Sequence, residues 1–276
     1  MLELDWLGAM RRAAMAQKRL FDEEPTIAGR TVFEGVGEGG DHALALDRRC
    51  EEIVFAELER LHAEANSDFV AISEERGEVA FGDPGSSWRV VIDPIDGSLN
   101  TRRTIPAFCL SVALASGPTM ADVELGFVHE FGTAEEFIAR RGAGAQLNGR
   151  ELRAEGPGYG LEVVGLESAD PRRIAPVVAA LAGKAYRVRM IGSIALTLCY
   201  VAAGRLDAML SARACRSVDA AAAQLIVTEA GAEVEFAGYE LKSAGLDLDA
   251  RYPVLAAHDS EMLATVRAAQ ALSPEA

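Results

Sequence analysis

The sequence predicts a mixed α and β protein of two halves, an N-terminal α+β half over residues 1–147 and a C-terminal α/β half over residues 148–276. Two observations predict this class. In the first half, helix-type apolar spacing is followed by alternating strands, whereas in the second half strands and helices alternate along the chain. Half of the 276 residues are hydrophobic, which is enough for a sizeable core. We expect the glycine-rich segment 142–145 to be a hinge between the halves.

The order of the expected elements follows from their apolar spacing. In the first half, helices are expected over 2–20 and 47–65, and strands over 69–73, 89–92, 107–115 and 122–130. In the second half, strands are expected at 161–166, 185–190, 206–210 and 253–257, and helices at 171–181, 194–203, 217–230 and 260–271. The alternation of the second half is typical of an α/β layer architecture.

Composition argues against several classes of partner. With 42 acidic against 27 basic residues, the net charge is −15, which leaves no basic surplus to neutralise nucleic-acid phosphates. The longest apolar stretches are too short to span a membrane, and the N-terminus carries no signal-peptide pattern. The four cysteines lie far apart with no CxxC pair. We therefore expect a cytoplasmic protein with reduced cysteines, whose partner is a small molecule rather than a nucleic acid or a membrane.

The most informative segment is the end of an apolar strand, where Asp93 and Asp96 follow with Pro94 between them. Because proline lacks an N–H and fixes φ, we expect strand pairing to stop there and the chain to turn. Both carboxylates then lie at one end of the sheet, where they can meet a hard cation. Gly97 allows close backbone approach, and the amides of Gly97 and Ser98 favour an anion at an expected helix start. The alternative is ordinary turn chemistry, in which Asp-Pro and Asp-Gly pairs bind nothing.

Three further carboxylates are candidates for the same site. Glu74 closes a short expected strand just as Asp93 closes its own, so the two can meet at one edge, whereas Glu75 is expected to be solvated surface. Asp219 and Asp47 lie in the first turns of expected helices. An acid there also interacts favourably with the helix dipole without any ligand. From the residues alone, a cation site and ordinary helix and surface charges both stay open.

Five segments resemble signatures of the inositol monophosphatase family, in family order and over nearly the whole chain. They are the segments 72–75, 93–100 (Asp-Pro-Ile-Asp-Gly-Ser-Leu-Asn), 142–149, 192–208 and 217–231. Val218 stands where the family usually has tryptophan, and residues 211–216 lack the acid that contacts inositol in inositol-specific members. The segment 40–47 resembles members that hydrolyse both inositol phosphates and fructose 1,6-bisphosphate, which indicates that branch.

The resemblance implies a layered α-β-α-β-α sugar-phosphatase fold and a phosphomonoesterase that uses Mg²⁺. Glu74, Asp93 and the Ile95 carbonyl are then expected to hold one ion. Asp93, Asp96 and Asp219 are expected to hold a second, and the family also allows a third, weakly held ion near Glu74. Mg²⁺ takes oxygen ligands and keeps several waters, which suits carboxylates together with a substrate phosphate. Two such ions would clamp the attacking and leaving oxygens.

The remaining site residues follow from the same resemblance. Asp47 with Ser98 is expected to orient or deprotonate the attacking water. The amides of Gly97 and Ser98 are expected to hold the phosphoryl oxygens. Gly192 and Ser193 belong to a block that resembles the family's Gly-Ser-Ala-Ala element and are expected to bind substrate. Family members are commonly homodimers, so a homodimer is expected.

Arginines lie near these segments in an otherwise acidic chain, at positions 102, 103, 172, 173, 187, 189, 213 and 216. Together they could bind a second phosphate group of the substrate. Arg189 and Arg216 are the best candidates because they flank the blocks that contain Gly192 and Asp219. The alternative for each arginine is a surface ion pair that contributes little.

The expected substrate is a small sugar or polyol phosphate, either inositol 1-phosphate or fructose 1,6-bisphosphate or both. Alternatives are a phosphatase of 3′-phosphoadenosine 5′-phosphate or NADP, or of histidinol phosphate. Adenine stacking has only Tyr159 and Tyr186 to support it. Outside enzymes, some family members serve as regulatory or RNA-machinery partners on the same fold. The intact set of metal carboxylates and the acidic balance argue against that alternative.

Overall fold

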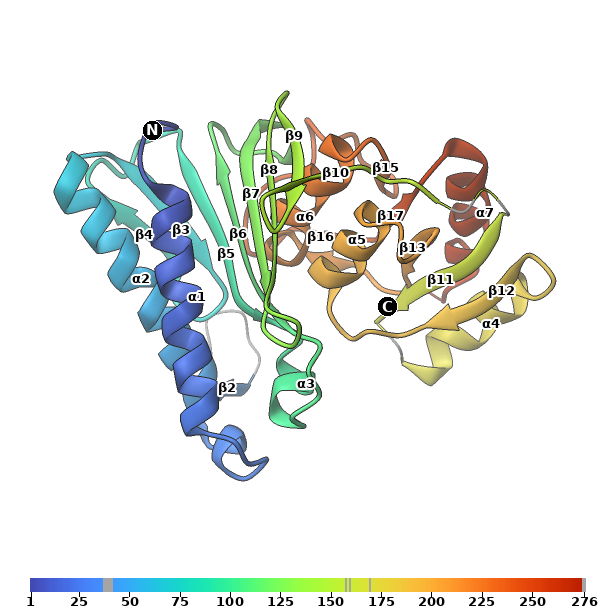
Figure 1. Ribbon diagram of the computed structural model, residues 1–276, viewed down its shortest axis with the longest axis horizontal. Coiled ribbons are helices and arrows are strands. Elements are labelled where there is room, and N and C mark those ends of the chain that lie inside the picture. Colours follow the sequence, from blue (N-terminus) through green and yellow to red (C-terminus); the bar gives the residue numbers. More distant parts are fainter. Residues whose placement is uncertain (37–41, 157, 159, 169, 275–276) are drawn as a thin grey trace.

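The structure is a computed structural model that describes residues 1–36, 42–156, 158, 160–168 and 170–274. Within these residues, helices and sheets stack as α-β-α-β-α layers (Figure 1), the fold that the sequence predicts. The helices are α1 (Trp6–Glu23), α2 (Ala45–Ala65), α3 (Ser98–Arg102), α4 (Pro171–Leu181), α5 (Ile194–Ala202), α6 (Ser217–Glu229) and α7 (Ser260–Gln270), with 3-10 turns η1 (Gly29–Thr31) and η2 (Met120–Asp122). Of these described helices, none combines the length and the apolar character that crossing a bilayer requires.

The first sheet has eight strands in the order β10-β9-β8-β7-β6-β5-β3-β4. They are β3 (Phe69–Ser73), β4 (Gly77–Phe81), β5 (Arg89–Asp96), β6 (Cys109–Ala115), β7 (Val123–Glu130), β8 (Glu135–Arg140), β9 (Gly144–Leu147) and β10 (Arg150–Leu152). The pairs are antiparallel except for β3 with β5, which are parallel neighbours with Ser73 opposite Ile92. Because parallel neighbours end at the same edge of a sheet, Glu74 and Asp93 lie at one edge, as the sequence predicts.

Helices α1 and α2 cover one face of this sheet (Figure 1). Their apolar stripes bury large side chains against the sheet: the ring of Trp6 meets that of Phe69 of β3 edge-on with centroids 5.4 Å apart, and Phe55 packs against Phe81 of β4. Burying one such side chain contributes about 1.5–3 kcal/mol. Since α2 packs on β5, the first turn of α2, which carries Asp47, lies beside the edge where β5 ends.

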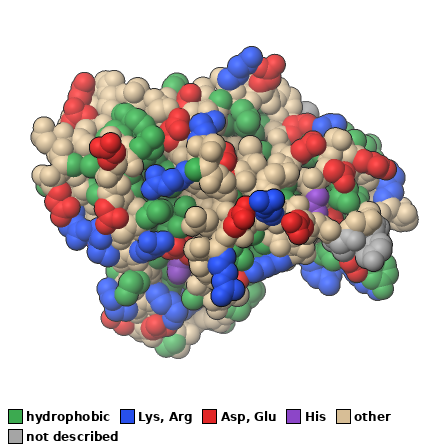
Figure 2. Space-filling model, turned by 45° about the horizontal axis from the view of Figure 1, so that its top comes forward, with side chains coloured by type: hydrophobic (Ala, Val, Ile, Leu, Met, Phe, Trp, Pro, Cys, Tyr) green, Lys and Arg blue, Asp and Glu red, His purple; other side chains and the backbone are tan. Residues whose placement is uncertain are grey.

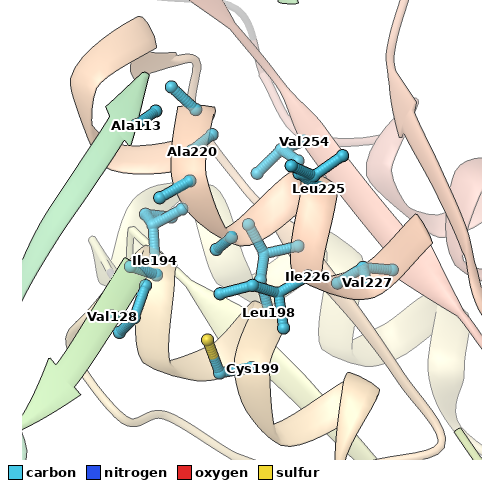
Figure 3. Packing of buried hydrophobic residues seen from close by; sticks show 14 of the residues in the cluster. Ala113, Val128, Ile194, Leu198, Cys199, Ala220, Leu225, Ile226, Val227 and Val254 are labelled. Atoms are coloured by element: carbon cyan, nitrogen blue, oxygen red, sulfur yellow. The ribbon is translucent and has the colours of Figure 1, made fainter. Parts of the chain in front are cut away.

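Helices α5 and α6 form the middle layer between the two sheets. Figure 3 shows Ala113 and Val128 of the first sheet facing Ile194 and other apolar residues of these helices. Both helices are buried almost all round, which explains their nearly continuous apolar sequences. On β7, a Cβ at Gly126 would lie 2.5 Å from the carbonyl oxygen of Ala222, so glycine permits the close approach of α6.

The second sheet has five strands in the order β12-β11-β13-β17-β15. They are β11 (Leu161–Glu167), β12 (Ala185–Arg189), β13 (Ala208–Ser211), β15 (Glu233–Phe236) and β17 (Val254–Ala257). Strand β11 is parallel to β12 and β13, whereas β17 is antiparallel to β13 and β15. Helices α4 and α7 lie on the outer face (Figure 1). Two small sheets pair β1 (Phe33–Val36) with β2 (His42–Leu44), and β14 (Cys215–Arg216) with β16 (Arg251–Tyr252).

The expected hinge at 142–145 is wrong. This segment is the turn between β8 and β9 and the start of β9, inside the first sheet. Gly142 and Gly144 have φ of +70° and +83°, a conformation that suits glycine in a tight hairpin. The expected boundary after residue 147 falls between β9 and β10, and β10 is still the edge strand of the first sheet. The chain passes to the second sheet between Leu152 and Leu161.

The strands that the sequence did not predict are mostly polar or at an edge. Strand β4 is an edge strand with alternating exposure, and β8 begins with two glutamates, so neither has the continuous apolar run of β5 or β6. Strands β9, β10 and β15 are short and were also not expected. The four cysteines are free and buried, as expected of core residues.

Candidate active site

The edge where β3 and β5 end opens into a cleft of about 450 Å³ that both halves line. The lining residues come from the end of β2, the start of α2, the ends of β3 and β5, both ends of α3, and the end of β14 with the start of α6. They are Leu44, Asp47, Glu74, Glu75, Asp93, Pro94, Ile95, Asp96, Gly97, Ser98, Arg102, Arg216 and Asp219. The cleft therefore brings together all the residues that the sequence singles out as candidate metal ligands, together with Asp47 and Ser98.

The end of β5 positions two of the carboxylates. Asp93 and Asp96 both pair with β6, but the register shifts between them because Pro94 cannot donate to the ladder. The expectation that pairing ends at Pro94 is thus wrong, since the ladder is interrupted and resumes at Asp96. Asp93 Oδ1 accepts a hydrogen bond from the N–H of Ile95 at 2.9 Å. Gly97 follows with φ +96°, and a Cβ there would lie 3.0 Å from a backbone carbonyl oxygen.

Asp96 is anchored to the second half of the chain. Its Oδ2 accepts hydrogen bonds from the hydroxyl of Ser193 and the N–H of Ala195, both at 2.6 Å. Ser193 is only 2% exposed and supports Asp96 from behind rather than lining the cleft. Gly192 lies outside the lining as well, and its N–H donates to the buried Glu167 at 2.9 Å. Gly192 and Ser193, expected to bind substrate, therefore lie in a segment that joins the two halves behind the carboxylates.

Burial and neighbouring carboxylates destabilise the ionised form of carboxyl groups in the cleft. Burial raises the pKa of Asp93 well above its ordinary value, and Asp96 and Asp219 raise it further. Burial, followed by the charge of Asp219, raises the pKa of Asp96 to about 7, and burial also raises the pKa of Asp219. Burial raises the pKa of Asp47 to about 6 against the opposing charge of Arg102. A cation would relieve this repulsion, so the charge of the site fits a metal ion.

Glu74 forms an ion pair with Arg216, which reaches it from the second half. Among the described residues, no three acidic, histidine or cysteine side chains lie close enough together to bind a metal as they are placed. The type of donor nevertheless fits Mg²⁺, because the lining offers carboxylate and carbonyl oxygens and no thiolate. Glu75, expected to be solvated surface, is half-buried and lines the cleft, so that expectation is wrong.

Known proteins are similar to this chain in both sequence and fold. The model of the inositol monophosphatase family matches residues 7–273. The chain belongs to the inositol monophosphatase family. A fructose-1,6-bisphosphatase/inositol-1-monophosphatase of Methanocaldococcus jannaschii is 35% identical over 240 residues, which cover 85% of this chain and 87% of that protein. A Nus factor SuhB of Vibrio cholerae is 33% identical, over 72% of this chain and 73% of that protein.

A solved structure agrees with the family assignment. The crystal structure of an inositol monophosphatase–fructose 1,6-bisphosphatase superposes with a TM-score of 0.82 at 28% identity, over 96% of this chain and 99% of that chain. Membership of the inositol monophosphatase family establishes the class of reaction. The protein is a phosphoric monoester hydrolase.

Most arginines of this inositol monophosphatase family member do not line the cleft, contrary to the expectation from the sequence. Within the described residues, Arg102 and Arg216 line it. Arg189 is exposed at the end of β12 and donates to the neighbouring backbone carbonyl, so its position does not support substrate binding. The guanidinium of Arg187 lies 3.7 Å from the ring centroid of Tyr186. Nearness in sequence to the family blocks did not indicate which arginines face the cleft, because it does not determine the direction of a side chain on the edge strand β12.

Sequence reasoning missed buried polar residues behind the cleft. Glu167 is 2% exposed and accepts hydrogen bonds from the N–H groups of Ile191 and Gly192, each at 2.9 Å, and from the hydroxyl of Thr197 at 2.6 Å. Asn100 donates to the carbonyl of Ile191 at 2.7 Å. Glu167 ends an apolar strand, as the candidate metal carboxylates of β3 and β5 do. That signal could have drawn attention to it.

Burial raises the pKa of Glu167 to about 7 from an ordinary value of 4.5. Because the folded protein keeps a proton that the unfolded chain releases, this group lowers stability as the pH rises from about 4.5 to about 7. Urea unfolding at several pH values measures this effect. Over that pH range, the free energy of unfolding of wild type is expected to fall by about 3 kcal/mol more than that of Glu167→Gln. Glu162→Gln, an exposed change on the same strand, should follow wild type. Parallel curves for wild type and Glu167→Gln would contradict the prediction.

Proposed function

We propose that this member of the inositol monophosphatase family is a Mg²⁺-dependent phosphomonoesterase of small sugar or polyol phosphates, namely inositol 1-phosphate, fructose 1,6-bisphosphate or both. The observation that carries the proposal is the cleft, where carboxylates of both halves meet the turn at Gly97 and Ser98. The name of the Methanocaldococcus jannaschii relative, a fructose-1,6-bisphosphatase/inositol-1-monophosphatase, supports the substrate class. We also propose that the protein is a homodimer, as members of this family commonly are. We propose a cytoplasmic location, which the four free cysteines support.

The metal would be held by oxygen donors of the cleft. Glu74, Asp93 and the carbonyl of Ile95 would bind one Mg²⁺, and Asp93, Asp96 and Asp219 a second. A third ion would bind weakly near Glu74. Bound Mg²⁺ would supply a water of lowered pKa and neutralise charge on the transferring phosphoryl group.

The protein's own groups divide the remaining work. Asp47 and Ser98 lie in the same cleft and would orient the attacking water and accept its proton. A base whose pKa is raised to about 6 suits proton transfer near neutral pH. The backbone at Gly97 and Ser98 would hold the phosphoryl oxygens, since glycine lets the chain approach the ligand closely. Helix α3, which starts there, has only five residues, so its dipole adds little.

The alternative functions have weaker support. Among the described residues that line the cleft none is aromatic, which disfavours adenine recognition in a nucleotide phosphatase. Tyr186 packs with Arg187, and Tyr159 lies outside the described residues. On the face in Figure 2, acidic and basic side chains are interspersed, unlike the basic stripe of an RNA-binding surface. The likeness to a Nus factor SuhB keeps a regulatory binding role as the second candidate. In the segment that indicated the dual branch, Gly40 and Asp41 lie outside the described residues.

Phosphate release in the presence and absence of Mg²⁺ tests the proposal, with fructose 1,6-bisphosphate and inositol 1-phosphate assayed side by side. Arg102 lines the cleft and adds positive charge there. Arg102→Gln is therefore expected to raise KM about tenfold for the bisphosphate and less for the monophosphate, because a charge-assisted bond to a second phosphate contributes about 1.5–3 kcal/mol. Arg187→Gln is the matched control and should change neither KM, because Arg187 does not line the cleft and lies over Tyr186.

Other outcomes would contradict the proposal in distinct ways. Release from 3′-phosphoadenosine 5′-phosphate, NADP or histidinol phosphate, with neither sugar phosphate hydrolysed, would favour the alternative phosphatases. A folded protein with no phosphate release from any of these substrates would favour the binding role. Equal effects of Arg102→Gln on both sugar phosphates would remove Arg102 as a second-phosphate contact.

A further inference from the structure

A buried glutamate lies one helical turn beyond Asp47. Glu51 on α2 is 0% exposed and does not line the cleft. Its Oε1 accepts hydrogen bonds from the backbone N–H groups of Glu75 at 3.3 Å and Arg76 at 3.2 Å. Burying a carboxylate is costly unless it is paired or hydrogen-bonded, so these contacts are strongly favoured once the helix and the turn are in place.

The two amides belong to the turn that carries Glu74. Strand β3 ends at Ser73 and β4 begins at Gly77, and these two residues are paired, so the turn consists of residues 74–76. Glu74 is its first residue and lines the cleft. The remaining two residues are the ones whose N–H groups bind Glu51. A side chain from α2 thus accepts hydrogen bonds from two of the three residues of the turn.

The side chain of Arg76 makes further contacts between the turn and α2. Arg76 Nε lies 3.4 Å from Glu51 Oε2, and the Arg76 guanidinium lies over the ring of Phe55 at 4.5 Å from its centroid. Phe55 is buried and follows Glu51 by one turn of α2. The β3–β4 turn is therefore held to α2 by two amides, an ion pair and a cation–π contact.

We propose that Glu51 is a positioning residue of the active site, which joins the β3–β4 turn to α2 and so sets the place of Glu74 relative to Asp47. Asp47 and Glu51 lie four residues apart on one face of α2. One rigid helix therefore carries Asp47 and, through Glu51, orients Glu74. The inference rests on the proposed function in that Glu74 is taken to be a metal ligand.

The test compares Glu51→Ala and Glu51→Gln with Glu130→Gln in the full-length protein. Glu130 is also buried, at 1% exposure, but it accepts from the hydroxyl of Tyr200 and does not line the cleft. Hydrogen exchange of the metal-free protein measures the exchange rates of the Glu75 and Arg76 amide protons. Calorimetric titration with Mn²⁺ measures metal affinity, and thermal unfolding shows whether each variant folds. The control removes a buried carboxylate charge without touching the turn.

Glu51→Ala is expected to speed exchange of the two amides about tenfold and to weaken Mn²⁺ binding by about 10–100-fold, as loss of a group that orients a ligand typically does. Glu51→Gln keeps an acceptor for both amides and should lie closer to wild type in both measurements. Glu130→Gln should match wild type in both. Phosphate release should fall through kcat more than through KM, because Glu51 does not line the cleft.

Unchanged amide exchange and unchanged Mn²⁺ affinity in a folded Glu51→Ala protein would overturn the proposal, as would equal losses in Glu130→Gln. If Glu51→Ala fails to fold, Glu51→Asp, which withdraws the carboxylate by one methylene, replaces it with the same expected and contradicting results. If wild type releases no phosphate, the proposed function fails. The exchange of the two amides in metal-free protein still decides whether Glu51 holds the turn.

Discussion

Asp96→Asn is expected to reduce turnover about 10²–10³-fold while the protein stays folded. Asparagine keeps an oxygen that can accept from Ser193 and Ala195, so the anchor to the second half survives. What is lost is an anionic ligand of the proposed metal site. Weaker metal binding removes stabilisation of the charge that develops on the phosphoryl group, and one such interaction contributes about 2.7–4 kcal/mol. Steady-state phosphate release measures the effect, and circular dichroism with thermal unfolding measures folding.

The control for this change is Asp207→Asn. Asp207 is 2% exposed and accepts from the N–H of Val163 at 2.7 Å, away from the cleft. It has the same chemistry and a comparable degree of burial, so a general cost of losing a buried carboxylate would appear in both variants. A folded Asp96→Asn protein with full activity would refute the assignment of the cleft as the active site.

Removal of divalent cations is expected to abolish phosphate release and to lower the melting temperature. The buried carboxylates raise one another's pKa, so a bound cation relieves a repulsion that the metal-free protein retains. At a free Mg²⁺ concentration of about 100 Kd, binding stabilises by about 2.7 kcal/mol. For a chain of this size that corresponds to roughly 5–10 °C. Chelation followed by Mg²⁺ titration in a thermal unfolding assay measures the shift.

Two controls separate binding from general salt effects. NaCl at matched ionic strength should leave the melting temperature nearly unchanged, because site binding rather than screening is responsible. Asp96→Asn should retain less than half of the Mg²⁺-dependent shift. Equal shifts in wild type and Asp96→Asn would place the bound cation elsewhere in the molecule.

The edge with Glu74 and Asp93 could be predicted because both residues end β-branched runs, and such runs form neighbouring buried strands. Asp219 could be located only by the resemblance, since an acid in the first turn of a helix has a purely local explanation. The helices were also predictable from their apolar spacing, and α4 spans the expected residues. The hinge was not, because Gly142 and Gly144 are equally compatible with a linker and with a hairpin.

The sequence by itself determined most helices, the apolar strands and the acids that end β3 and β5, because apolar periodicity and strand-ending acids are local properties of the chain. Only the tertiary structure decided which polar groups face the cleft and which stand behind it. Ser193 is hydrogen-bonded behind Asp96, Arg189 is exposed on an edge strand and does not line the cleft, and Glu51 accepts hydrogen bonds from a turn that begins 23 residues later. Such roles depend on contacts between distant segments, and a side chain that can donate or accept a hydrogen bond does not reveal its partner until those segments pack together.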